Sequence, residues 1–116
     1  MKMALMVYTS QPQKLLTDIK KQIDEKKIET WEYDKDGDFT HSVDQWKNKG
    51  YLRPHITSGY LQFGLLGLKS TSMSRTIYGV YHGRFIEMLL THFYGQLSNA
   101  TATSQPQAGL DQVQLQ

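Results

Sequence analysis

Two stretches of alternating apolar and polar residues, 51–57 and 60–65, flank the dipeptide Ser58-Gly59. Alternation with a period of two is typical of a strand with one buried face, and a two-residue turn with glycine is typical of a hairpin. This turn sets Ile56 opposite Leu61, so that apolar residues meet apolar residues along both strands. A three-residue turn would mix the two faces. The chain is therefore expected to contain an antiparallel sheet built on this hairpin.

Pro54 lies inside the first of these strands. Proline has no backbone N–H and cannot donate to a ladder, so this strand should have a free side or a bulge there. A further hairpin is expected from 28–33 and 39–42, joined by Lys35-Asp36-Gly37, whose glycine can adopt the left-handed conformation. That loop sets Trp31 opposite His41. The agreement between turn chemistry and side-chain pattern favours both hairpins.

A helix is predicted over residues 11–26. Ser10 and Gln13 match a capping box, and Pro12 suits the first turn of a helix. Apolar residues then recur at helical spacing, at Leu15, Leu16, Ile19 and Ile23.

The segment 76–81, rich in β-branched and aromatic residues, is predicted to be a strand. His82-Gly83-Arg84 would then lie at a strand-to-helix junction, since apolar residues at spacings of three and four indicate a second helix over about 83–97. These residues are Ile86, Leu89, Leu90, Phe93 and Leu97.

The composition changes after residue 98. Residues 99–116 are rich in glutamine and small polar residues, and too few are apolar to fill a core. We therefore expect one domain over 1–98 and a disordered tail over 99–116. A chain of 116 residues suits a single core.

The predicted fold class is α+β, a two-layer sandwich in which a largely antiparallel sheet of four to six strands packs against two helices. The segment at the N-terminus, Met3–Tyr8, is compatible with a further strand or a frayed leader. The predicted core comprises Leu16, Ile19, Ile23, Leu61, Phe63, Leu65, Ile77, Ile86, Leu89, Leu90 and Phe93.

Composition excludes several functions. The chain has no cysteine, which rules out disulfides, thiolate metal sites and cysteine nucleophiles. No apolar run approaches the ~20 residues that span a bilayer, and the N-terminus does not resemble a secretory signal. We therefore expect a soluble, cytoplasmic protein. No histidine pair has metal-ligand spacing, and Asp34, Asp36 and Asp38 lack the closing glutamate of a calcium loop, so they are interpreted as turn formers, with no metal or cofactor expected.

The most specific candidate site is His82, Gly83 and Arg84. At a helix start, unpaired amides and the positive end of the helix dipole attract anions, glycine permits close approach, and arginine can contact an oxyanion. The opposing interpretation is that Gly83 merely caps the helix while Arg84 lies in solvent. No phosphate-binding loop or catalytic set accompanies the motif, so no catalytic residue is assigned.

A second candidate is one face of the main hairpin, which we call the interaction face. It interleaves aromatic residues with polar and charged ones, a composition found in protein interfaces and in nucleic-acid binders. The alternative is an ordinary solvent-facing or helix-covered surface. The interaction face comprises Tyr51, Arg53, His55, Tyr60 and Gln62.

These features favour a small non-enzymatic interaction or regulatory module, whose partner is another protein or a second copy of the chain. One alternative is an anion-binding domain or small enzyme centred on His82-Gly83-Arg84. A nucleic-acid binder is less favoured, because the net charge is only +2. The element order resembles the layout of double-stranded RNA-binding domains, but the lysine cluster at their last helix is missing here.

Overall fold

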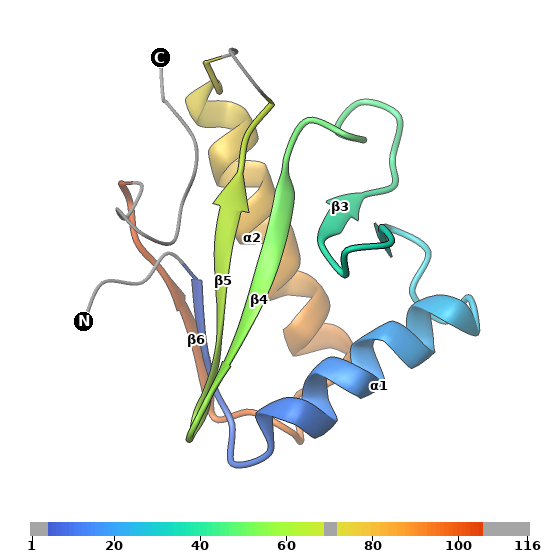
Figure 1. The fold of residues 1–116 in the computed structure, drawn as a ribbon, viewed down its shortest axis with the longest axis vertical. Helices are drawn as coiled ribbons and strands as arrows, with labels where there is room; N and C mark the ends of the chain where they lie inside the picture. Colours follow the sequence, from blue (N-terminus) through green and yellow to red (C-terminus); the bar gives the residue numbers. More distant parts are fainter. Residues whose placement is uncertain (1–4, 69–71, 106–116) are drawn as a thin grey trace.

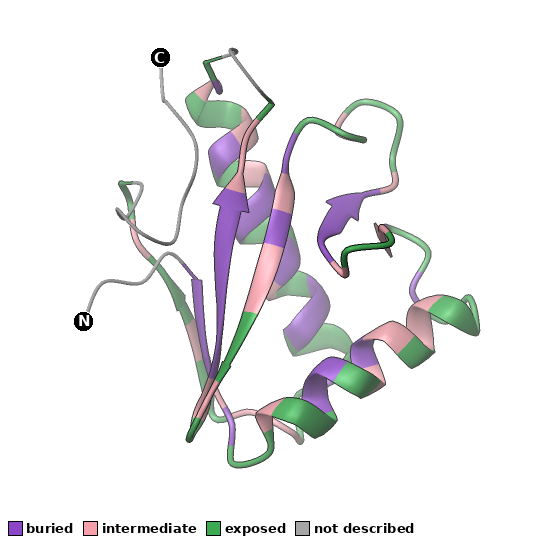
Figure 2. Ribbon diagram, viewed as in Figure 1, coloured by how far each residue is buried: buried purple, intermediate pink, exposed green. Residues whose placement is uncertain are grey.

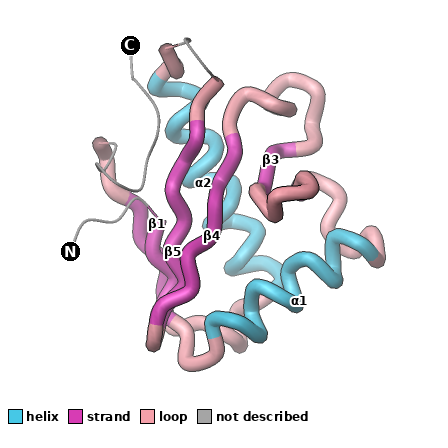
Figure 3. The backbone as a smooth tube through the Cα atoms, in the orientation of Figure 1, coloured by secondary structure: helices cyan, strands magenta, loops and turns pink. Residues whose placement is uncertain are grey.

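The computed structural model describes residues 5–68 and 72–105, which form two helices and one six-stranded sheet (Figures 1 and 3). In chain order the elements are β1 (Leu5–Tyr8), α1 (Pro12–Asp24), β2 (Trp31–Tyr33), β3 (Phe39–His41), β4 (Tyr51–Thr57), β5 (Tyr60–Leu66), α2 (Arg75–His92) and β6 (Asn99–Ala102). The strands lie in the order β2-β3-β4-β5-β1-β6, and each neighbouring pair is antiparallel. The predicted α+β class is confirmed.

Both predicted hairpins are confirmed in register. Ile56 lies opposite Leu61 across β4 and β5, and Trp31 lies opposite His41 across β2 and β3. The turn glycines Gly59 and Gly37 have φ values of 86° and 82°, the left-handed region that glycine adopts without strain.

The predicted free side of the proline-containing strand is also present. Strand β3 pairs with β4 only at Phe39 and Leu52, so Pro54 has no partner strand on that side. Its missing N–H therefore leaves no gap in the ladder.

Helix α1 is confirmed, but its predicted cap is wrong. Gln11 is the N-cap residue and makes no side-chain cap hydrogen bond, while Pro12 occupies the first turn as expected. The hydroxyl of Thr9, not that of Ser10, accepts a hydrogen bond at this end, from the Gln11 amide at 3.2 Å. The fixed φ of proline is enough to start this helix without a side-chain cap.

The predicted strand at 76–81 is wrong, because these residues form the first half of α2. The helix begins after Ser74, whose hydroxyl accepts from the Ile77 amide at 3.1 Å. Tyr78, Tyr81 and Phe85 recur at helical spacing and are all buried against the sheet. Burial of this aromatic stripe outweighs the strand preference of the individual residues. The helix also ends earlier than predicted, at His92.

The prediction of disorder over 99–116 is wrong for the first residues of this segment. Asn99–Ala102 form β6, which pairs with β1 so that Tyr8 faces Asn99 and Leu5 faces Ala102. A strand is added at a sheet edge mainly through backbone hydrogen bonds, which do not require apolar side chains. The remainder of the tail from residue 106 lies outside the described residues.

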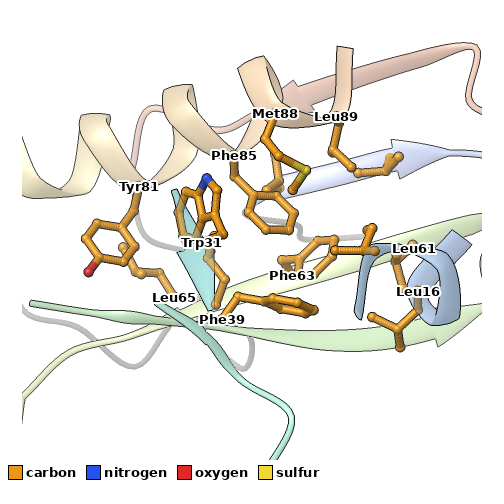
Figure 4. Packing of buried hydrophobic residues seen from close by; sticks show 14 of the residues in the cluster. Leu16, Trp31, Phe39, Leu61, Phe63, Leu65, Tyr81, Phe85, Met88 and Leu89 are labelled. Atoms are coloured by element: carbon orange, nitrogen blue, oxygen red, sulfur yellow. The ribbon is translucent and has the colours of Figure 1, made fainter. Parts of the chain in front are cut away.

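The core lies between the sheet and the two helices, which both cover the same face (Figures 1 and 2). At its centre, Trp31, Phe39, Phe63 and Phe85 pack edge-on or tilted, with ring centroids 4.7–6.1 Å apart (Figure 4). The prediction that Leu90 belongs to the core is wrong, because this residue is 53% exposed on the outer side of α2. The other predicted core residues are buried or half-buried against this cluster.

Candidate functional site

A pocket of about 320 Å³ opens between the β2–β3 hairpin, the turn after β3 and the middle of α2. We call it the hairpin pocket. It combines two indole rings and an aliphatic residue with a histidine, an arginine and a glutamate. Its lining residues are Thr30, Trp31, His41, Val43, Gln45, Trp46, Arg84 and Glu87.

The first wall is set by the register of the β2–β3 hairpin. Trp31 and His41 are directly opposite each other, with ring centroids 4.9 Å apart. Trp31 is 2% exposed and stands edge-on to Tyr81 and Phe85 of α2, at 5.6 and 5.0 Å. Figure 4 shows the indole between these two rings. Because it is held on three sides, this wall is rigid.

The second wall is the turn over residues 43–50, which carries Trp46. The Trp46 amide donates to the Val43 carbonyl at 2.9 Å, and the Tyr81 hydroxyl donates to the Trp46 carbonyl. A further bond joins the Asn48 amide to the Thr40 hydroxyl at 3.0 Å. The turn is thus tied to both α2 and β3, and the pocket is preformed.

His41 is the most buried polar group of the pocket, at 5% exposed. Its Nδ1 atom accepts a hydrogen bond from the Val43 amide at 3.2 Å. A backbone amide can only donate, so Nδ1 is unprotonated and the neutral ring carries its hydrogen on Nε2. No described residue forms a hydrogen bond with Nε2. The ring therefore lines the pocket and carries an N–H that a ligand could use.

The charge state of His41 follows from its surroundings. Burial lowers the pKa of the imidazole below its usual value near 6.5, and the positive charge of Arg84 lowers it further. Glu87 acts in the opposite direction. The lowered pKa keeps His41 neutral at pH 7, and the influence of both charges on the ring agrees with their shared place in the pocket.

Arg84 and Glu87 are paired at the rim of the pocket. Nη1 of Arg84 donates to both carboxylate oxygens of Glu87, at 3.3 and 3.5 Å. The two side chains are 56% and 64% exposed, so the pair is weak. Among the described residues, nothing contacts Nε or Nη2 of Arg84 through a hydrogen bond. Two further donors of the guanidinium are thus available.

The anion site predicted at His82-Gly83-Arg84 is wrong in its geometry. All three residues lie in the interior of α2, where backbone amides are used by the helix itself. His82 is buried, with Nδ1 2.8 Å from the Tyr78 carbonyl, while Gly83 and Arg84 are on the exposed side of the helix. Arg84 lines the hairpin pocket and His82 does not. The pocket therefore brings Arg84 together with His41 instead.

The interaction face is one side of β4 and β5 but is not an open patch. Both oxygens of the buried Asp38 carboxylate accept from Arg53, at 3.0 and 2.8 Å, and this bonding raises the pKa of Arg53. Gln62 is buried at 6% exposed. His55 is exposed, while the two tyrosines predicted beside it, Tyr51 and Tyr60, are half-buried.

The three aspartates of the β2–β3 loop act within the loop. Asp34 Oδ1 accepts from the amides of Asp36 and Asp38, each at 3.0 Å, as expected of a turn former. Their carboxylate oxygens lie within 4.8 Å of one another. Since Arg53 occupies both oxygens of Asp38, the arrangement is explained by the loop and this ion pair.

Sequence reasoning missed the central residue of the pocket. The sequence pattern assigns no role to His41. The predicted register already placed it beside Trp31, which is the one signal that pointed to it. Trp46 and Arg84 join them only through the tertiary fold.

Comparisons with protein-family models, with curated proteins and with solved structures give no match. Within residues 5–68 and 72–105, neither helix has the length and apolar character needed to cross a bilayer.

Proposed function

We propose that this protein is a small-ligand binding module and that the hairpin pocket is its binding site. The observation that carries the proposal is a preformed pocket lined by His41, whose Nε2–H has no hydrogen-bond partner among the described residues. In the absence of a ligand this N–H can only be hydrated. A ligand that accepts this hydrogen bond would gain about 0.5–1.5 kcal/mol, the net worth of a typical hydrogen bond that replaces one to water.

The size and lining of the pocket support a ligand with one or two rings. Small-molecule sites usually have volumes of about 300–1,000 Å³ and combine apolar walls with a few fixed polar groups. The hairpin pocket, at about 320 Å³, lies at the lower end of this range. The ring of Trp46, which lines the pocket and is half-buried, offers a flat apolar surface on which a planar ring packs well.

The two tryptophans make the test direct. They are the only tryptophans of the chain and both line the pocket, so tryptophan fluorescence reports on this site alone. Titration with a panel of planar ring compounds should change the emission in a saturable way. Amide chemical shifts should move at 41–46 and 84–87 and remain unchanged at the 58–59 turn.

A blocking variant provides the control. Val43 lines the pocket and is 44% exposed, so Val43→Phe should fill the cavity without disturbing the core. Ile56→Phe is the matched change, because Ile56 is 47% exposed and lies outside the pocket. Binding should be lost in the first variant and retained in the second. Equal binding by both variants, or no saturable binding of any ring compound, would refute the proposal.

A protein-interaction module in the cytoplasm, with a second copy of the chain as its partner, is the second candidate. It is supported by two large exposed residues, Leu90 in the last turn of α2 at 53% and Tyr94 just beyond the helix at 76%. Sedimentation velocity over a hundredfold range of concentration tests it. A dimer that is lost in Leu90→Ser/Tyr94→Ser supports this candidate, and a monomer at every concentration excludes it.

A further inference from the structure

The polar groups of the hairpin pocket identify a class of ligand. We infer that the pocket selects planar carboxylates, and that the carboxylate is bound jointly by Arg84 and by the Nε2–H of His41. This inference rests on the proposed ligand-binding function, since it names the ligand of the same pocket.

His41 contributes a donor that discriminates between ligands. Its Nδ1 atom is occupied by the Val43 amide, so the pocket receives an N–H and not a lone pair. The ligand group that meets Nε2 must therefore be a hydrogen-bond acceptor. The residue is 5% exposed, so a ligand bound here would shield this hydrogen bond from solvent and strengthen it.

Arg84 contributes the positive charge and a fixed shape. Only its Nη1 atom is used by Glu87, which leaves Nε and Nη2 for a ligand. These two nitrogens form the planar fork that matches the two oxygens of a carboxylate. A carboxylate on a planar ring can meet this fork while its ring lies against the indole of Trp46.

The negative charge of Glu87 disfavours binding of a carboxylate and has to be weighed against the donors of Arg84 and His41. It lines the same pocket and is 64% exposed. Its carboxylate repels an anionic ligand, but its charge is largely screened by solvent and is compensated by Arg84. The donors of Arg84 and His41 therefore decide the selectivity, and removal of the Glu87 charge should strengthen carboxylate binding. We expect Glu87→Gln to tighten it about three- to tenfold.

Three ligands of similar size but different charge show which kind of ligand the pocket prefers. Benzoate carries the carboxylate, benzamide is its neutral planar counterpart, and benzyltrimethylammonium carries a positive charge that an aromatic site with a glutamate could also bind. We expect benzoate to bind at least about tenfold more tightly than benzamide, because charge-assisted hydrogen bonds are roughly twice as strong as neutral ones. The affinities are measured by tryptophan fluorescence on the full chain.

Variants at position 84 test whether Arg84 causes the preference for a carboxylate. Arg84→Gln should reduce the preference for benzoate over benzamide to within about twofold while benzamide still binds. Arg84→Lys keeps the charge but not the fork, so an intermediate preference is expected. Arg75→Gln, an exposed arginine on the same helix outside the pocket, should have no effect.

Each result has a distinct meaning. If none of the three ligands binds and the wider ring panel also fails, the proposed function is wrong together with the inference. If benzamide binds as tightly as benzoate, or if the ammonium compound binds more tightly, the pocket binds ligands but the inference is overturned. A preference for benzoate that persists in Arg84→Gln also overturns it, because the carboxylate is then bound elsewhere.

Discussion

The two hairpins of this protein differ in how many polar side chains they bury. Strands β4 and β5 are seven residues each, and the one buried polar side chain between them is that of Gln62. The β2–β3 hairpin has strands of three residues, yet it buries polar side chains at Asp38, Thr40 and His41. Buried polar groups cost free energy unless they are paired. The long hairpin therefore forms the central part of the sheet, while the short one holds most of the buried polar side chains of the two.

The polar residues of the short hairpin are held by partners from distant parts of the chain. Asp38 binds Arg53 of β4, and the Thr40 hydroxyl lies 3.0 Å from the Tyr81 hydroxyl of α2. His41 differs from Asp38 and Thr40, because its Nε2–H has no hydrogen-bond partner among the described residues and the residue lines the hairpin pocket. The difference between the hairpins indicates where a ligand would find an unsatisfied group.

The largest expected effect tests whether the two hairpins share one core. Phe63 of β5 and Phe39 of β3 are both 0% exposed and their rings are 6.1 Å apart. Truncation to alanine should cost about 3–5 kcal/mol at either position, because a large cavity remains. Urea denaturation measures both, with Ile56→Ala as the exposed control. A loss below about 1 kcal/mol for Phe39→Ala would show that the short hairpin is only loosely attached.

A smaller effect is expected at the ion pair between the hairpins. Arg53→Met keeps the length of the side chain but leaves the Asp38 carboxylate, 3% exposed, without its two hydrogen bonds from Arg53. The free energy of unfolding should fall by about 1–3 kcal/mol. Arg84→Met, which breaks an exposed pair, should change stability by less than about 0.5 kcal/mol. Equal losses in the two variants would contradict the burial of the Asp38 pair.

The pH dependence of stability tests the burial of His41. Its pKa is lowered in the folded protein and near 6.5 in the unfolded chain. Between these values the unfolded chain binds more protons, so the free energy of unfolding should fall as pH falls through 6.5. One proton gives a slope of at most about 1.4 kcal/mol per pH unit. His41→Gln should remove this contribution, as urea denaturation between pH 8 and pH 5 would show. Parallel pH profiles for the two proteins would place His41 in solvent.

The smallest expected effect is the difference in stability loss between substitutions in the two hairpin turns. Gly59→Ala and Gly37→Ala each place a side chain at a positive φ, which costs about 1–2 kcal/mol. At Gly59 nothing lies within 4 Å of the added Cβ, whereas at Gly37 the Nζ atom of Lys20 is 3.1 Å away. Because that atom ends a flexible side chain, the two costs should be nearly equal. Thermal unfolding of both variants measures the difference. A loss at Gly37 more than about 1 kcal/mol larger would show that Lys20 is fixed.

Local sequence patterns were sufficient to predict secondary structure where the side-chain period and the residue preferences agreed. Both hairpin registers follow from a period of two combined with the turn residues, and α1 follows from a helical period that starts at a proline. The segment 76–81 carries conflicting signals, since its residues favour strands one by one while Tyr78 and Tyr81 begin a helical stripe that continues to Phe85. Neighbouring residues alone cannot resolve such a conflict.

The amino-acid sequence by itself determined the α+β class, the two hairpins and the opposition of Trp31 to His41. Only the tertiary structure decided that 75–82 are helical, that Asn99–Ala102 complete the sheet, and that Arg84 and His41 line the same pocket. Alternation and turn chemistry act between residues a few positions apart, so they can be read along the chain. The pocket joins residues more than 40 positions apart, and packing of α2 against the aromatic core brings them together.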